Sequence, residues 1–117
     1  MYFLLLIHAS EKDWEAASSP VQAEVMRRHE ELERDLRATG RYKGCGGLAP
    51  ASSAKVVRHR DGKPIVTDGP FAEAREQVGG YYLVEANDIE EATAIAARIP
   101  GVADAAVEVR ALRDVRF

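Results

Sequence analysis

A short apolar run near the start of the chain, from Tyr2 to His8, most constrains the fold. Its shortness and aromatic content favour a β-strand over a fragment of helix, a choice that periodicity does not decide. Neither set of alternating side chains in the run is polar, so both faces of this strand need cover. The run is also far below the roughly 20 apolar residues that span a bilayer, and it lacks the basic leader of a secretory peptide. We therefore expect no membrane partner.

A long amphipathic helix follows from about Ser19 to Gly40. Ser19 can cap its start, Pro20 suits the first helical position, and Gln22 completes a capping box. Gly40 supplies the left-handed residue that ends it. One stripe of the helix is formed by residues spaced three and four apart, which are Val21, Val25, His29, Leu32 and Leu36.

The rest of the chain is predicted to form five more strand segments and a second helix. Asp61-Gly62 suits a two-residue hairpin turn between strands 55–60 and 63–67. Asp88 caps a second helix over 89–99, which Pro100-Gly101 ends. Residues 9–18 are expected to form a loop, and further strands are expected at 42–48, 78–85 and 107–112. Gly44, Gly46 and Gly47 suggest a bulge or a close backbone approach in the first of these.

The order strand–helix–strand, hairpin, strand–helix–strand predicts an α+β fold, a ferredoxin-like sheet with two helices on one face. We expect residues 1–117 to form a single domain. The sheet is apolar on both sides, but the helices cover one, so a second subunit should cover the other. The prediction is a homodimer, with the two sheets facing each other as a dimeric α+β barrel.

Charge and cysteine content exclude several classes of function. The chain has 16 Lys and Arg against 19 Asp and Glu, a net charge of −3, so no broad positive field attracts nucleic acid. The lone Cys45 forms no intramolecular disulfide and fits a reducing, cytoplasmic location. His29 and Glu33 are four apart, but Glu33 stands where a zinc-protease motif has its second His, and we predict no metal. No phosphate loop or dinucleotide fingerprint is present, so no cofactor is expected.

Three groups of residues are candidates for chemistry. His29 lies between Val25 and Leu32 on the apolar stripe and points at the sheet, which fits either a core-edge histidine or a general base. Asp68 fits either a turn residue that accepts backbone N–H groups or a carboxylate that orients His29. Glu108 and Arg110 share one face of the last strand, with Val107 and Val109 on the other. This pair fits either a structural ion pair or a clamp in which Arg110 holds an anion.

Two segments carry a combination of motifs that is specific to one family. They are Arg60 to Glu73, which contains Asp68-Gly69-Pro70-Phe71, and Glu76 to Val84, which contains Gly79-Gly80-Tyr81-Tyr82. In these segments the chain resembles the YCII-related proteins of the DGPF type. The first and last strands are similar as well. The resemblance implies a bacterial, dimeric α+β barrel, found as a free protein or beside extracytoplasmic-function sigma factors. It also implies a His/Asp site, which by analogy falls on His29 and Asp68. His8 stands where relatives usually have Tyr, and it brings a second imidazole toward any site at that end of the first strand.

Two functions are therefore expected. The first is a small cofactor-independent isomerase or lyase that acts on a small cyclic or aromatic anion. In it His29 is the base, Asp68 orients it, and Arg110 with Tyr81 or Tyr82 stabilises the developing charge. The alternative is a non-catalytic dimeric module that binds a small molecule or a regulatory partner.

Overall fold

The computed structural model describes residues 1–116. The strands in this part of the chain are β1 (Tyr2–Ala9), β2 (Tyr42–Gly47), β3 (Lys55–Arg60), β4 (Lys63–Asp68), β5 (Gln77–Glu85) and β6 (Ala106–Ala111). The helices are α1 (Glu11–Ala16), α2 (Ser19–Ala38) and α3 (Ile89–Ala96), with a 3₁₀ turn, η1 (Ala51–Ser53), before β3. None of these helices combines the length and apolar character that crossing a bilayer requires.

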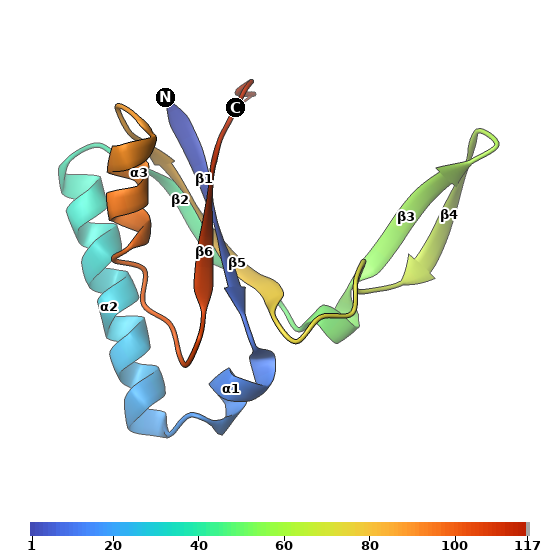
Figure 1. The fold of residues 1–117 in the computed structure, drawn as a ribbon, viewed down its shortest axis with the longest axis horizontal. Helices are drawn as coiled ribbons and strands as arrows, with labels where there is room; N and C mark the ends of the chain where they lie inside the picture. The colour runs from blue at the N-terminus through green and yellow to red at the C-terminus, as the bar shows by residue number, and fades with distance from the viewer. Residues whose placement is uncertain (117) are drawn as a thin grey trace.

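Four of the strands form one antiparallel sheet in the order β2-β5-β1-β6. Helices α2 and α3 lie together on one side of it (Figure 1). This is the ferredoxin-like α+β arrangement that the sequence predicts. The remaining two strands, β3 and β4, pair with each other in a separate two-stranded sheet.

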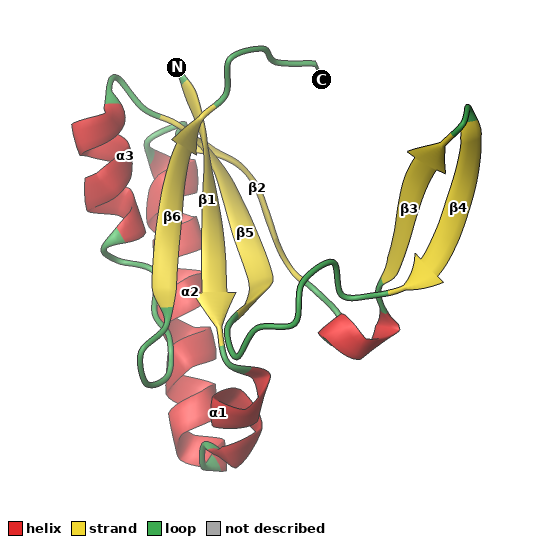
Figure 2. Ribbon diagram, turned by 45° about the vertical axis from the view of Figure 1, so that its right-hand side comes forward, coloured by secondary structure: helices red, strands yellow, loops and turns green. Residues whose placement is uncertain are grey.

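Alternation along the strands divides the side chains of the sheet between two faces. On the helix side, paired residues form a row Cys45–Tyr82–Leu5–Val109 and, next to it, a row Gly47–Gly80–Ile7–Val107. On the other side lie the rows Gly44–Leu83–Leu4–Arg110 and Gly46–Tyr81–Leu6–Glu108. We call this second side the uncovered face, because neither α2 nor α3 packs on it (Figure 2).

The core fills the layer between the sheet and the two helices. Its fully buried members include Phe3 and Leu5 from β1, Val84 from β5 and Leu32 from α2. Burial of a side chain of this size contributes about 1.5–3 kcal/mol relative to leaving it in water.

The apolar stripe predicted on α2 is partly confirmed, since Leu32 and Leu36 are buried while Val21 is exposed.

The start of α2 differs from the prediction by one residue. The cap is Ser18, whose Oγ accepts a hydrogen bond from the Val21 N–H at 3.3 Å. Gln22 does not complete a capping box, because its side-chain amide donates to the carbonyl of Trp14 at 2.8 Å. The predicted end is confirmed, since Gly40 has φ +73° and follows the last turn.

The expectation of a loop over residues 9–18 was wrong, because residues Glu11–Ala16 form α1. The Oγ of Ser10 accepts a hydrogen bond from the Asp13 N–H at 3.2 Å and caps this helix. The spacing Ser10 to Asp13 is a capping signal, but six residues show no apolar period from which a helix could be predicted.

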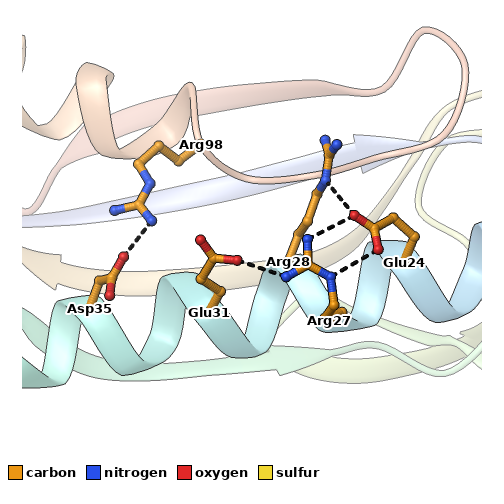
Figure 3. A network of polar contacts seen from close by, with 6 residues as sticks. All are labelled: Glu24, Arg27, Arg28, Glu31, Asp35 and Arg98. Atoms are coloured by element: carbon orange, nitrogen blue, oxygen red, sulfur yellow. Dashed lines mark hydrogen bonds and ion pairs between the residues drawn. The ribbon is translucent and has the colours of Figure 1, made fainter.

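The second predicted helix is shorter than expected. It ends at Ala96 instead of Ile99, and residues 97–99 form tighter turns in which the N–H groups of Arg98 and Ile99 donate to the carbonyls of Ile95 and Ala96, three residues earlier. Arg98 beyond its end forms an ion pair with Asp35 of α2 at 2.6 Å, which joins the two helices on their outer side (Figure 3).

The exposed surface of α2 carries ion pairs between residues three or four positions apart. Glu24 accepts hydrogen bonds from Arg27 and from Arg28, and Arg27 also reaches Glu31 at 2.9 Å (Figure 3). The Arg27 guanidinium is the main cause that lowers the pKa of Glu24 to about 2. Glu33 and Arg37 pair one turn further on at 2.9 Å.

The β3–β4 hairpin extends away from the rest of the molecule, on the side of the sheet opposite α2 and α3 (Figures 1 and 2). We call these two strands the arm. Its turn has the positive φ values that the Asp61-Gly62 dipeptide predicts, 53° and 75°. The radius of gyration is 16.0 Å, against about 13 Å for a compact chain of this length. The arm accounts for this extended shape.

Candidate functional site

A cavity of about 490 Å³ lies where α1 and α2 meet the end of the sheet. This volume falls in the range of small-molecule sites, roughly 300–1,000 Å³. Most of the side chains around it are apolar, and His29 and Tyr82 are its polar centre. The apolar and glycine residues that line it include Ile7, Trp14, Val25, Met26, Gly46, Gly47, Leu48, Gly79, Gly80, Pro100, Gly101, Val102 and Ala105.

Missing side chains on the sheet leave room for this cavity. In the row Gly47–Gly80–Ile7–Val107, two of the four positions on the helix side are glycine. A Cβ added at Gly47 would meet nothing within 4 Å, whereas one at Gly80 would lie 2.9 Å from the carbonyl oxygen of Gly46. Gly80 is therefore required by close backbone approach, and Gly47 borders open space.

His29 and Tyr82 form the hydrogen bond at the centre of the site. Nδ1 of His29, from α2, lies 2.7 Å from the phenolic oxygen of Tyr82, from β5. Their rings are stacked, with centroids 5.8 Å apart and an interplanar angle of 16°. This contact confirms that His29 points toward the sheet. It leaves Nε2 as the nitrogen that is not bonded to Tyr82.

Burial sets the protonation of both groups. It lowers the pKa of His29 below its ordinary 6.5, so the imidazole is neutral at pH 7. Burial is also the main cause that raises the pKa of Tyr82 well above its ordinary 10, so the phenol keeps its proton. A neutral imidazole beside a protonated phenol can accept a proton at Nε2 and donate the Nδ1 hydrogen to the Tyr82 oxygen.

Charged groups around the cavity are acidic. Glu11 and Glu15 line it, and no Lys or Arg is among the lining residues within the described part of the chain. One oxygen of Glu11 accepts the Ala51 N–H at 2.7 Å, which ties α1 to the segment that precedes the arm. The lining therefore favours a ligand without negative charge.

Four of the other predicted site residues lie on the uncovered face, on the far side of the sheet from His29. Nε2 of His8 is 3.0 Å from Glu108, and Nε of Arg110 is 3.9 Å from the other oxygen of Glu108. Tyr81 lies on the same face, with its ring against Gly46. Val107 and Val109 pack against the core, as the alternation of β6 predicts. Thus the sheet separates His8, Tyr81, Glu108 and Arg110 from His29 and Tyr82.

Asp68 lies at the base of the arm. Its carboxylate binds Nζ of Lys55 at 2.5 Å, and its side chain is 83% exposed. It does not line the cavity, and desolvation is the cause that lowers the pKa of His29, with no carboxylate contributing. Within one chain the structure therefore does not bring Asp68 and His29 together.

Only part of the cavity wall is predictable from the sequence. Trp14 lines the cavity from α1, a segment that was expected to be a loop. Pro100 and Gly101 were interpreted as the end of a helix, yet they and Val102 close the other side. The position of these residues in a loop after a helix does not indicate a pocket, because the pocket depends on which strands the loop faces in the folded chain.

The described residues show no group of three or more His, Cys, Asp or Glu side chains that could hold a metal ion. Glu33 is bound to Arg37 and does not join His29 in a ligand pair.

Comparison with known proteins establishes the family. The family model of the YCII-related domain matches residues 1–116. The chain is also 34% identical over 92 residues to an uncharacterised protein of Rhizobium meliloti (strain 1021), a match that covers 79% of this chain and 74% of that protein. The chain belongs to the YCII-related family, in agreement with the resemblance stated above. Since that relative's name states no activity, function has to be argued from the site.

Proposed function

We propose that this protein is a small cofactor-independent enzyme in which His29 abstracts a proton from a substrate bound in the cavity. The observation that carries the proposal is the half-buried imidazole of His29, which lines a 490 Å³ cavity and is hydrogen-bonded to Tyr82. Because burial lowers the pKa of His29, its basic form persists below pH 7. An isomerisation or elimination would follow the abstraction.

Tyr82 completes the acid–base pair. When its oxygen accepts the Nδ1 hydrogen of His29, Nε2 keeps a free lone pair to act as the base. The phenolic hydrogen of Tyr82 is then left to donate to an oxygen of the substrate, where negative charge develops. After the proton transfer, the hydrogen bond from Nδ1 to Tyr82 stabilises the imidazolium. No third residue is needed for this step.

The lining indicates the class of substrate. Apolar walls with Trp14 fit a small cyclic or aromatic compound, and the carboxylates of Glu11 and Glu15 disfavour one that arrives as an anion. We therefore propose a carbonyl compound that is uncharged when it binds and that becomes an enolate when His29 takes the proton from the carbon next to the carbonyl group. An anionic substrate, or a role for Asp68 or Arg110 at His29, would require a second chain to supply these groups.

Proton exchange tests the proposal without knowledge of the product. A panel of uncharged cyclic ketones would be incubated with the protein in D₂O, and loss of substrate C–H signals would be followed by NMR. His29→Gln should slow exchange at least about 100-fold, the contribution of a general base. Tyr81→Phe, on the uncovered face, should leave the exchange rate unchanged. Exchange that survives His29→Gln would overturn the mechanism.

A cavity-filling variant separates binding from catalysis. Gly47→Leu places a side chain where an added Cβ has no neighbour within 4 Å, and it leaves His29 and Tyr82 in place. It should raise the concentration of substrate needed for half-maximal exchange. Compounds that bind to the wild type, shown by a thermal shift, without any exchange would favour the alternative of a non-catalytic sensor or regulatory module.

We also propose that the protein is a cytoplasmic homodimer. Leu4, Leu6 and Leu83 lie partly exposed on the uncovered face, and Tyr81 beside them is 36% exposed. A contiguous apolar strip of this kind is typical of a surface that a partner covers. The free thiol of Cys45 fits a reducing compartment. Sedimentation equilibrium should give twice the mass of the chain.

A further inference from the structure

The arm lacks cover from its own chain. Val57 and Val66 lie opposite each other on one side of it, and they are 55% and 61% exposed. An isolated two-stranded hairpin is marginally stable in water and needs further strands or a surface to pack against. The other side of the arm has a contact within the chain, since the Arg58 guanidinium lies 5.1 Å from the ring of Phe71. The side formed by Val57 and Val66 is therefore the one left for a partner.

The chain exposes more surface area than a compact monomer of its mass should. It exposes 8073 Å², against about 6,300 Å² expected for a compact monomer of its mass. The excess of about 1,800 Å² per chain, or about 3,600 Å² for two, falls in the range of obligate homodimer interfaces, roughly 2,000–5,000 Å². The extended arm and the uncovered face both contribute to this excess.

Charge distinguishes the arm from the rest of the chain. Between Lys55 and Asp68 the arm has four Lys and Arg against two Asp, and the remainder has 12 Lys and Arg against 17 Asp and Glu. The arm thus carries +2 and the remainder −5. A second copy of this chain therefore attracts the arm electrostatically, and it offers an apolar sheet surface as well.

The direction of the arm agrees with such contact. It projects on the side of the sheet opposite α2 and α3, which is the side of the uncovered face (Figures 1 and 2). A copy that docks on this face lies within reach of the arm, and by two-fold symmetry its own arm returns the contact.

We propose that the arm of each chain packs its Val57–Val66 side over the uncovered sheet face of a second copy. The inference rests on the homodimer proposed above and specifies what holds it together. The arm is then a reciprocal clamp, and its valines are buried in the assembly.

Sedimentation of paired variants tests the clamp. Val57→Asp with Val66→Asp should weaken dimerisation at least about 100-fold, because two carboxylates would be buried without partners. Ile89→Asp is the matched control, since Ile89 is 48% exposed at the start of α3, away from both surfaces. It should dimerise like the wild type. Circular dichroism should be unchanged for both proteins, because the arm shares no sheet with the core.

Cross-linking identifies the surface that the arm touches. Val66 would be replaced by p-benzoylphenylalanine, and ¹⁵N-labelled and unlabelled chains would be mixed before irradiation. Mass spectrometry should find links between differently labelled chains, from position 66 to peptides of β1, β5 or β6. Links confined to one chain, or links to α2, α3 or another arm, would overturn the proposal.

The possible failures are distinguishable. A monomeric wild type would overturn both the homodimer and the clamp. A wild type and an arm variant that are equally dimeric, with no link from position 66 to another copy, would overturn the clamp and leave the homodimer on the sheet face. Neither result bears on proton exchange at His29, which is measured separately.

Discussion

Nδ1 of His29 and the phenolic oxygen of Tyr82 lie 2.7 Å apart, although 53 positions separate the two residues in the chain. Helix α2 and strand β5 meet here because the apolar stripe of α2 packs on the helix side of the sheet. The contact places a base and a proton donor side by side at the wall of a cavity, without a carboxylate between them.

Removing the phenolic oxygen should destabilise the fold. In Tyr82→Phe the half-buried Nδ1 of His29 loses its partner, so the free energy of unfolding in urea should fall by about 1–3 kcal/mol. Tyr81→Phe is the control on the adjacent residue. Because the Tyr81 ring lies on the other face, its change should stay within about 0.5 kcal/mol. Equal losses in the two variants would contradict the assigned hydrogen bond.

The lowered pKa of His29 predicts how stability depends on pH. Below about pH 6.5 the unfolded chain takes up a proton on this histidine that the folded chain resists. The contribution of His29 to the free energy of unfolding is therefore fully present above about pH 6.5. It is lost as the pH falls from there through the pKa that His29 has in the folded chain.

His29→Gln should remove this component of the acid-side loss. The measurement is the free energy of unfolding in urea at about pH 7.5 and about pH 5.5. Tyr81→Phe, on the uncovered face, should keep the wild-type dependence. An NMR titration in which His29 has a pKa above 6.5 would show that burial does not dominate its environment.

The position of the α2 cap can be measured directly. Ser18→Ala removes the acceptor of the Val21 N–H and should cost about 1 kcal/mol of folding stability. Ser19→Ala removes the residue that the sequence favoured and should change stability by less than about 0.5 kcal/mol. The reverse order of the two effects in thermal unfolding would place the cap at Ser19.

Two glycines that pair across β2 and β5 should respond differently to the same methyl group. Gly80→Ala brings a Cβ within 2.9 Å of a carbonyl oxygen on the neighbouring strand. Overpacking of this kind should cost about 1–3 kcal/mol. Gly47→Ala meets open space and should remain within about 0.5 kcal/mol of the wild type. Melting temperatures of the two variants check the difference.

Much of the fold was predictable because its determinants are local. Asp61-Gly62 dictates its turn through two positive φ values. Val107 and Val109 alternate with Glu108 and Arg110, which assigns the two faces of β6. Helix α1 escaped prediction because a helix of six residues shows no apolar period, although Ser10 marks its start.

The candidate site was only partly predictable. The stripe position of His29 indicates that it points inward, and this requires no knowledge of distant residues. The partnership with Tyr82 and the cavity itself depend on strand register, and a glycine gives no direct sign of the space it leaves. The arm likewise places Asp68 beside Lys55, a pairing fixed by the hairpin register.

The sheet is a partition, and Tyr81 and Tyr82 are neighbours on opposite sides of it. Substitutions in α1 or in the loop after α3 can change the shape of the cavity, which lies on the Tyr82 side of the sheet. They leave the residues of the uncovered face, which include Tyr81, unaltered. In proteins built on this plan, ligand preference and subunit association are therefore free to diverge independently. A shift of β5 by one residue would disturb both at once, because it would exchange the two tyrosines.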